Sequence, residues 1–253
     1  MIQNTKIVGI LNITPDSFSD GNKYTDEESI LNHTKQLIKD GADIIDVGAE
    51  STRPNATKLS DEEEWQRLSP ILKKVINTCH EHGAKVSLDT YHPPSAQKAI
   101  ELGIDYINDV DGFKNPQMIE AIQDADTKLI VMHSLTVPAD KSINIPTDLD
   151  VIEEIKSWAK YKISQLEQSG IDKSRLIFDP GIGFNKTAGQ SKEIIKRVEE
   201  LKSLDVPLYI GHSRKSFLGD VECRDTATTQ ISKELIEKDI DYIRVHDVKG
   251  HYK

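Results

Sequence analysis

The chain has 253 residues, of which 37% are hydrophobic and 29% are charged. This composition is typical of a folded globular protein and excludes a disordered one. Acidic residues outnumber basic ones by 42 to 32, and the formal net charge of −10 argues against a nucleic-acid partner. An anionic ligand would therefore have to be held by a local group of cations.

The chain carries no sign of a membrane or secretory destination. No apolar run approaches the roughly 20 residues that span a bilayer, and the first residues do not resemble a signal peptide. Two isolated cysteines, Cys79 and Cys223, form neither a disulfide framework nor a zinc motif. We therefore expect a cytoplasmic protein without membrane or nucleic-acid partners.

Short apolar runs alternate with longer amphipathic stretches along the chain. Near-continuous Ile, Val and Leu in these runs are typical of parallel strands that are buried on both faces. The stretches 61–83 and 151–170 have the clearest helical pattern, and each ends at a glycine. The strand-like runs are 6–11, 43–48, 85–89, 106–110, 128–133, 175–181, 207–213 and 242–248.

Eight strand-like runs separated by helices predict one α/β domain over residues 1–253, a (β/α)₈ TIM barrel. A doubly wound open sheet is the alternative. Only residues 249–253 follow the last run, which is too short for a helix. We therefore expect the eighth helix to be truncated or missing, and that side of the barrel to be left partly uncovered or covered by another segment or subunit.

Polar residues gather at the carboxyl ends of the predicted strands, where barrels of this kind place their chemistry. One acid in such a position is more often a helix cap, but eight polar ends that meet at one mouth indicate a pocket. Carboxylates and amides suit a heterocycle with a guanidine-like N–H edge, and a basic group suits a phosphate. These residues are Asn12, Asp46, Glu50, Asp89, Asn108, Asp109, His133, Asp179, Ser213, Arg214, Lys215, Arg244 and His246.

Some of these residues also have a purely structural interpretation. His133 ends an apolar strand, and we expect a hydrogen-bonded structural histidine there. Asp46 and Glu50 can each hold loop backbone. Asp43 and Asp105 precede strands and belong at the opposite, stabilising end of the barrel.

Six sequence motifs identify a family resemblance over essentially the whole chain. Together they resemble dihydropteroate synthase, a family of pterin-binding TIM barrels. The resemblance implies condensation of 6-hydroxymethyl-7,8-dihydropterin pyrophosphate with p-aminobenzoate to give 7,8-dihydropteroate and pyrophosphate, a step of folate biosynthesis that sulfonamides inhibit. The motifs are NITPDSFSDG (12–21), AESTRP (49–54), INDVDG (107–112), DPGIGFNKT (179–187), SRKSF (213–217) and RVHDV (244–248).

The resemblance also implies a role for each matching residue. The pterin is bound by Asp89, Asn108, Asp179 and Lys215. Pyrophosphate is bound by Asn12, Thr52, Arg244 and His246, with Mg²⁺ on Asn12. The p-aminobenzoate pocket is formed by Pro54, Phe184, Lys215 and Ser216. Asp16, Arg53 and Lys215 are the catalytic residues, in an SN1-like, Mg²⁺-assisted loss of pyrophosphate.

The assembly and two competing functions remain open at this stage. We expect a homodimer, because helices on the side of the missing helix help to form one in this family, and fusion to or association with another folate-pathway domain stays open as an addition to it. His212, before SRK, would add cationic character near the phosphate at low pH. A pterin-barrel methyltransferase shares the acidic slot but needs no pyrophosphate cluster. A non-catalytic relative is the third possibility, which the retained polar residues disfavour.

Overall fold

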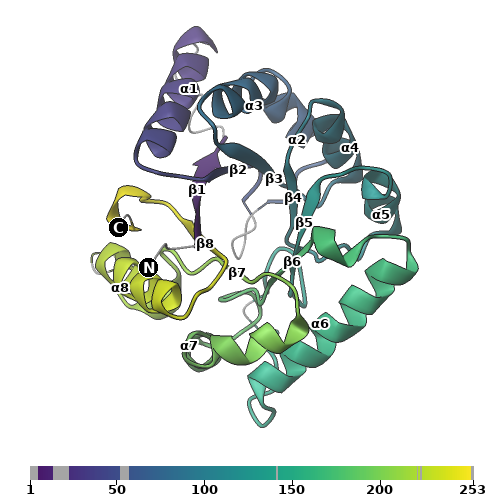
Figure 1. The fold of residues 1–253 in the computed structure, drawn as a ribbon, viewed down its shortest axis with the longest axis vertical. Helices are drawn as coiled ribbons and strands as arrows, with labels where there is room; N and C mark the ends of the chain where they lie inside the picture. The colour runs from purple at the N-terminus through teal and green to yellow at the C-terminus, as the bar shows by residue number, and fades with distance from the viewer. Residues whose placement is uncertain are drawn as a thin grey trace.

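Eight parallel strands form the wall of a barrel in the computed structural model, which describes residues 5–13, 23–51, 57–140, 142–220, 222 and 224–251 (Figure 1). The strands are β1 (Lys6–Asn12), β2 (Ile44–Gly48), β3 (Lys85–Asp89), β4 (Tyr106–Asp109), β5 (Lys128–Met132), β6 (Leu176–Asp179), β7 (Tyr209–Ile210) and β8 (Tyr242–Val245). Hydrogen-bonded neighbours follow the order β6-β5-β4-β3-β2-β1-β8-β7.

A single parallel bridge closes the remaining gap in this order. Phe178 of β6 pairs with Leu208, just before β7, and the Phe178 amide donates to the carbonyl of Pro207 at 2.8 Å. The sheet is therefore a closed barrel, which confirms the predicted fold and rules out the open doubly wound alternative.

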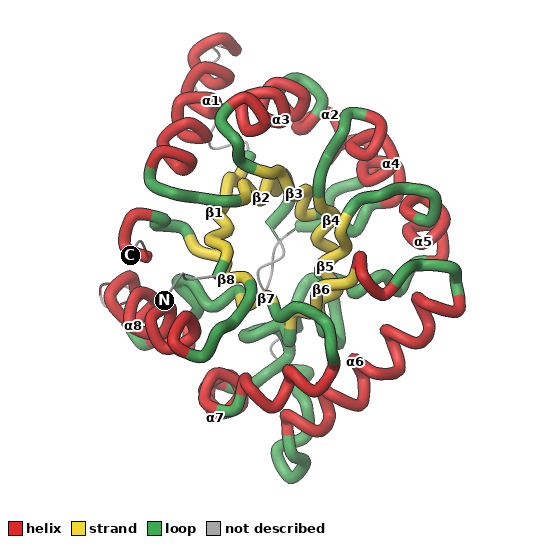
Figure 2. The backbone as a smooth tube through the Cα atoms, in the orientation of Figure 1, coloured by secondary structure: helices red, strands yellow, loops and turns green. Residues whose placement is uncertain are grey.

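Helices surround the strands as an outer ring (Figure 2). The α-helices are α1 (Lys23–Lys39), α2 (Asp61–Leu68), α3 (Leu72–Glu81), α4 (Pro93–Glu101), α5 (Pro116–Ile122), α6 (Val151–Gln168), α7 (Ala188–Lys196) and α8 (Arg224–Glu237). The 3₁₀ helices are η2 (Lys173–Arg175), η3 (Val198–Leu204), η4 (Ser216–Leu218) and η6 (Lys249–His251). In the described part of the chain, none of these helices is long and apolar enough to cross a membrane.

The helix predicted over 61–83 is two helices, so that prediction was wrong in its detail. Helix α2 ends at Leu68, and α3 begins at Leu72. Pro70 lies between them and has no amide proton to donate to the preceding turn, so the helical hydrogen bonds stop there although Ser69 still has helical backbone angles. By contrast, α6 fills the predicted 151–170 stretch and ends before Gly170, which has the left-handed φ of 85° that glycine tolerates.

Two apolar layers hold the barrel together. The large layer lies between strands and helices, and the small one fills the barrel interior. Because successive residues of a strand point to opposite faces, the residues two positions after the inner apolar ones also face inward. The inner layer consists of Val8, Ile44, Ile130, Ile177 and Tyr209, with Tyr106 and Tyr242 packed against it.

The amino end of the barrel is closed by acids, as predicted for Asp43 and Asp105. Each carboxylate accepts a hydrogen bond from the first part of a neighbouring strand, Asp43 from Ile7 at 2.8 Å and Asp105 from Val86 at 2.9 Å. These acids satisfy strand amides and do not belong to the site.

The segment after β8 covers part of the barrel where a helix was expected to be missing. Val248 is 1% exposed, and a Cβ added to Gly9 of β1 would lie 3.1 Å from its side chain. Within the described residues, β8 is then followed by η6. Val248 thus shields the outer face of β1 without a full helix.

Candidate active site

Strand register places three polar predicted residues in one row at the carboxyl end of the barrel. Asn12 pairs with Gly48, Gly48 with Asp89, and Asp89 with Asn108. Paired residues of neighbouring strands point to the same face, so these side chains share the mouth of the barrel. Gly48 leaves room between them: a Cβ there would lie 3.9 Å from Asn12 Oδ1 and 3.8 Å from Asp89 Oδ2.

Arg244 crosses the barrel interior to two acids from other strands. Its Nε donates to Asp46 Oδ2 at 2.6 Å, and its Nη2 donates to Asp89 Oδ2 at 2.8 Å. Asn108 Nδ2 donates to the same Asp46 oxygen at 3.1 Å. The four side chains therefore form one hydrogen-bonded network beneath the mouth, held by charge-assisted bonds.

Three buried polar atoms in or near this network have no hydrogen-bond partner among the described residues. They are Asp46 Oδ1, Asn108 Oδ1 and the hydroxyl of Tyr209. Burial raises the pKa of Tyr209 well above its usual value, and burial also raises the pKa of Asp89 despite the opposing charge of Arg244. Buried acceptors without donors are costly, so this part of the barrel is prepared for a ligand or water that brings N–H or O–H groups.

Asp179 ends β6 on the opposite wall. Its Oδ1 accepts the amide of Gly181 at 2.7 Å, and its residue is 5% exposed. Burial raises its pKa to about 6, although the Gly181 bond and the charge of Lys215 oppose the rise. Near neutral pH the carboxyl is therefore largely ionised and can accept further hydrogen bonds.

The basic side of the mouth comes from the loops after β6, β7 and β8. Lys215 Nζ lies 4.2 Å from the centre of the Phe184 ring, a cation–π contact. The hydroxyl of Ser213 lies 2.9 Å from His246 Nδ1 and accepts the His246 amide at 3.2 Å. Ser216 is exposed at the start of η4. The structure thus brings Lys215 close to Phe184, and His246 close to the SRK segment.

Two buried histidines near the strand ends have structural roles. His133 Nδ1 lies 2.9 Å from Lys186 Nζ, and burial lowers its pKa to about 2, in agreement with the predicted structural role. The expectation for His212 was wrong. Its Nε2 contacts Ser232 Oγ of α8 at 2.8 Å, and burial lowers its pKa to about 4, so it adds no charge near the mouth. Asp109 caps its own turn through the amides of Asp111 and Phe113.

Four predicted site residues fall outside the described residues: Asp16, Thr52, Arg53 and Pro54. Of the thirteen residues given roles by the family resemblance, the structure therefore describes nine, and these nine lie on strands, loops and the start of η4 at the carboxyl end of the barrel.

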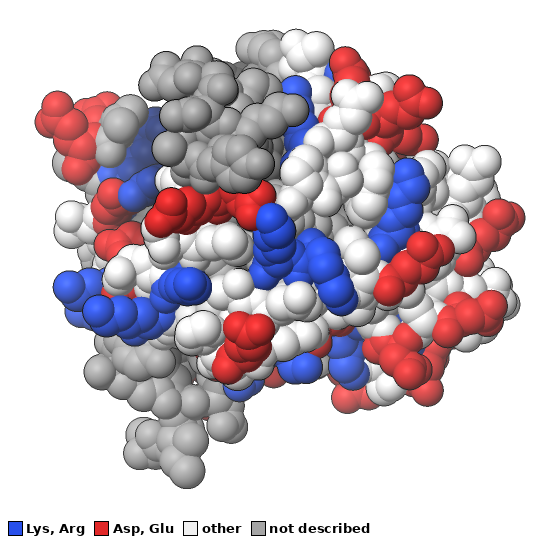
Figure 3. All heavy atoms as spheres, turned by 90° about the horizontal axis from the view of Figure 1, so that it is seen from above, with Lys and Arg blue, Asp and Glu red and all other residues white. Residues whose placement is uncertain are grey.

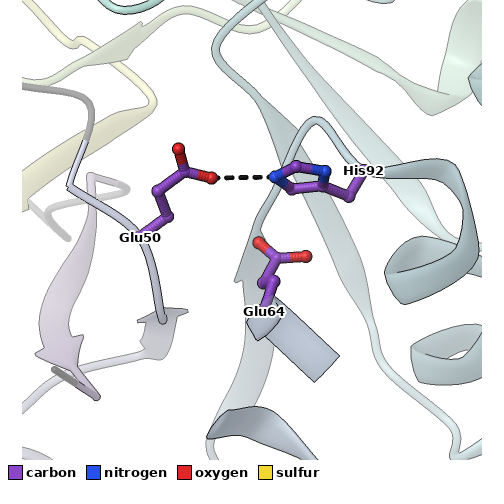
Figure 4. A group of neighbouring side chains, drawn as sticks. All are labelled: Glu50, Glu64 and His92. Atoms are coloured by element: carbon purple, nitrogen blue, oxygen red, sulfur yellow. Dashed lines mark hydrogen bonds and ion pairs between the residues drawn. The ribbon is translucent and has the colours of Figure 1, made fainter. Parts of the chain in front are cut away.

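A second polar group lies beside this mouth, and sequence reasoning did not find it. Glu50, Glu64 and His92 each offer an atom within 4.8 Å of the others, which is the spacing of a metal site (Figure 4). However, His92 Nε2 contacts Glu50 Oε2 at 2.8 Å and Nδ1 contacts Asp61 Oδ1 at 2.6 Å. Ionised carboxylates only accept, so both ring nitrogens carry protons and neither has a lone pair for a metal.

Charged side chains of both signs are mixed on the outer side of the barrel. Figure 3 shows acidic and basic side chains intermixed on the face seen from above, where the described residues form no continuous basic surface.

A closed barrel with acids and amides on one wall of its mouth and cations at its rim is typical of an enzyme that binds a polar, anionic small molecule. The sequence profile of the family described as "Pterin binding enzyme" matches residues 8–246. A dihydropteroate synthase of Clostridium beijerinckii is 39% identical over 253 residues, covering 97% of this chain and 90% of the relative. A probable bifunctional folylpolyglutamate synthase/dihydropteroate synthase of Haloferax volcanii is 35% identical; the match covers 96% of this chain and 29% of that protein.

Solved structures give the same result. Dihydropteroate synthase from Anaplasma phagocytophilum with bound 6-hydroxymethylpterin-monophosphate superposes with a TM-score of 0.90 at 36% identity, over 98% of this chain and 95% of that one. The Xanthomonas albilineans enzyme with 4-aminobenzoic acid gives 0.87 at 32% identity, over 98% and 89%. This chain belongs to the dihydropteroate synthase family, whose members are transferases.

Proposed function

We propose that this protein condenses 6-hydroxymethyl-7,8-dihydropterin pyrophosphate with p-aminobenzoate to give 7,8-dihydropteroate and pyrophosphate, in folate biosynthesis. The observation that carries the proposal is the set of buried acceptors in the barrel, above all Asp46 Oδ1 and Asn108 Oδ1, which have no donor among the described residues. A pterin ring presents amino and ring N–H groups that would satisfy them.

In this proposal, the pterin lies between Asp89, Asn108, Asp179 and Lys215. Asp179 would accept from the amino and ring N–H edge, which its ionised carboxylate suits. Lys215 would approach the ring from the rim, where its stem packs against Gly183: a Cβ at that glycine would lie 3.3 Å from Lys215 Cδ.

The pyrophosphate would be bound by Asn12, Thr52, Arg244 and His246. Asp46 and Asp89 already take Nε and Nη2 of Arg244, so the guanidinium is oriented before substrate arrives and its other N–H groups would face the phosphate. We propose that Asn12 also holds Mg²⁺. Its exposed amide oxygen beside the Asp89 carboxylate fits a hard cation that prefers oxygen ligands.

The arylamine pocket would be formed by Pro54, Phe184, Lys215 and Ser216. Phe184 offers a flat apolar surface for the aromatic ring, and Lys215, held over Phe184, would border the pocket on the side of the pterin. A sulfonamide with the same aromatic amine would compete for this pocket, so we propose that the protein is a sulfonamide target.

An arylamine is a weak nucleophile, so we propose that pyrophosphate leaves first. The exocyclic carbon of the pterin would then carry positive charge that the ring delocalises, and Asp16 would stabilise it. Arg53, Arg244 and His246 would neutralise the charge that develops on the departing group. Mg²⁺, when bound, would supply further positive charge at the phosphate oxygens. The arylamine nitrogen then attacks the exocyclic carbon, so that a C–N bond replaces the broken C–O bond, and the proton that the nitrogen loses passes to the released pyrophosphate or to solvent.

We also propose that residues 1–253 form one domain, that the protein works in the cytoplasm and that it forms a homodimer. The buried free thiol of Cys79 is compatible with a reducing compartment. The dimer is proposed from the family resemblance, and the exposed apolar side chains of Ile143, Leu149 and Tyr161 are candidates to be covered by a second copy. Size-exclusion chromatography with light scattering tests the dimer, and the intact mass of the native protein tests a fusion.

Pyrophosphate release tests the function directly. The purified protein should release pyrophosphate only when both substrates are present, and chelation with EDTA should abolish the release until Mg²⁺ is returned. Asn12→Ala should raise the Mg²⁺ concentration that half-saturates activity. Methyl transfer from methyltetrahydrofolate without pyrophosphate release would favour the methyltransferase alternative. Pterin binding without either reaction would favour a non-catalytic relative.

A further inference from the structure

His92 joins two segments that flank an undescribed stretch of the chain. Its Nε2 contacts Glu50, two residues after β2 ends, and its Nδ1 contacts Asp61, the first residue of α2. The side chain of His92 is only 8% exposed, and the ring of Tyr91 stacks on it at 4.4 Å between centroids. We call Glu50, Asp61, Glu64 and His92 the His92 clasp.

The charges around the ring make it a cation. Both nitrogens donate to carboxylates, as shown above, and the buried carboxyl of Glu64 lies within the same group (Figure 4). Burial by itself lowers the pKa of His92, but the hydrogen bond to Glu50, the charge of Glu64 and the hydrogen bond to Asp61 outweigh it and raise the pKa to about 9. The bond to His92 in turn lowers the pKa of Glu50 against its burial.

The other bonds of the clasp tie the same two ends together. Glu50 Oε1 accepts the amide of Leu59 at 3.2 Å and the hydroxyl of Tyr91 at 2.6 Å. Glu64 Oε2 accepts the hydroxyl of Thr90 at 2.8 Å, which fixes α2 to the loop that carries His92. A capping box between Ser60 and Glu63 sets the start of α2.

We propose that His92 is a positioning residue whose imidazolium fastens the two ends of segment 51–60 to the loop after β3. That segment contains Thr52, Arg53 and Pro54, so the proposal rests on the proposed function, which gives those residues their roles. His92 itself touches neither substrate. Its effect on the reaction is carried through Glu50 and Asp61.

Three variants test the clasp. His92→Ala removes both bonds, His92→Lys keeps a cation beside the acids, and Asp61→Asn keeps the fold because Asp61 is half exposed (51%). The matched control is His80→Ala, since His80 also pairs with a carboxylate, Asp105, at 2.7 Å, but at the amino end of the barrel. Hydrogen–deuterium exchange of the backbone amides at 57–61 and steady-state kinetics are measured on each full-length protein.

We expect His92→Ala to speed exchange at 57–61 by about tenfold or more, because the substitution removes at least one charged hydrogen bond that holds this segment. It should raise KM for p-aminobenzoate by about ten- to a hundredfold, because a displaced positioning segment misplaces reacting groups. KM for the pterin substrate should change much less, His92→Lys should recover most of the loss, and His80→Ala should behave as wild type.

The exchange readout does not depend on activity, so it separates this proposal from the proposed function. If the wild-type protein releases no pyrophosphate, the proposed function is wrong, and the expected change in KM for p-aminobenzoate falls with it. Unchanged exchange in His92→Ala, or in Asp61→Asn should His92→Ala not fold, overturns the clasp. So does one equivalent of tightly bound transition metal that is present in wild type and lost in His92→Ala. If KM for p-aminobenzoate rises equally in His92→Lys and His92→Ala, the positive charge of His92 has no role in positioning.

Discussion

Arg244 and Asp46 lie 198 residues apart in the sequence, and a 2.6 Å hydrogen bond joins them inside the barrel. The bond links β8 to β2, and the second contact of Arg244, to Asp89, extends the link to β3. Arg244 therefore belongs as much to the acidic wall of the site as to its basic rim.

Replacing Arg244 by Ala should destabilise the protein by about 3–5 kcal/mol, because Asp46 and Asp89 would remain buried without their counter-charge. Urea denaturation at pH 7 measures the change. The control is Arg197→Ala, whose ion pairs with Asp150 and Glu200 lie at the surface and should matter far less. Equal effects of the two substitutions would show that the Arg244 network does not stabilise the fold.

Asp179→Asn should lower the rate of pyrophosphate release at least about a hundredfold while leaving the circular dichroism spectrum unchanged. The side-chain amide of the variant would place an N–H donor against the pterin edge, which in the proposal also offers N–H donors, so the two would not bond. Lys215→Ala should have a similar effect through the loss of its charge. Asp172→Asn, at the amino end of the barrel, serves as the control for carboxylate loss. Near-normal turnover in either site variant removes that residue from the proposed pterin site.

Gly181→Ala should destabilise the fold by more than about 2 kcal/mol, because the residue has a left-handed φ of 67° and a Cβ would lie 2.0 Å from the His133 carbonyl oxygen. Gly103→Ala is the matched comparison. Its φ is 88°, but nothing lies within 4 Å of the added Cβ, so only the backbone strain of about 1–2 kcal/mol applies. Thermal melts of both variants measure the difference, and equal melting temperatures would contradict the close approach.

The His92 clasp should make stability depend on pH. The folded pKa of His92 is about 9, above the unfolded value of 6.5, so its contribution is fully present below about pH 6.5 and is lost as pH rises through about 9. The pKa of Glu50 is lowered, so its contribution is present above about 4.5 and is lost on acidification through its folded value. The unfolding free energies of wild type and His92→Gln should differ on the order of 2 kcal/mol at pH 6 and should converge by pH 10. A difference that grows with pH would contradict a protonated ring.

Much of this architecture can be predicted from the sequence, because its causes are local. Continuous apolar runs indicate buried parallel strands, and polar residues at their ends locate the mouth of a barrel. Sequence reasoning also separates Asp43 and Asp105 from the site, because position before a strand places them at the amino end. The split between α2 and α3 could have been predicted too, since Pro70 was visible within the helical stretch.

The rest depends on contacts between distant segments, which no local pattern reveals. His212 precedes a basic motif, yet its side chain turns away to Ser232 of α8. Arg244 lies within β8 and was expected to bind phosphate at the rim, but its hydrogen-bond partners are acids inside the barrel. The clasp escaped prediction because Glu50 and His92 lie 42 positions apart and each has an ordinary solvent or capping interpretation by itself.

The single bridge between β6 and β7 has a consequence for ligand binding. Every other pair of neighbouring strands is joined by two or more paired residues, so this junction is the least reinforced part of the wall. Asp179 stands on one side of it and Lys215 follows from the other. A ligand that contacts both residues would link β6 to the loop after β7. Saturating ligand should therefore slow local opening more at this junction than in the rest of the barrel.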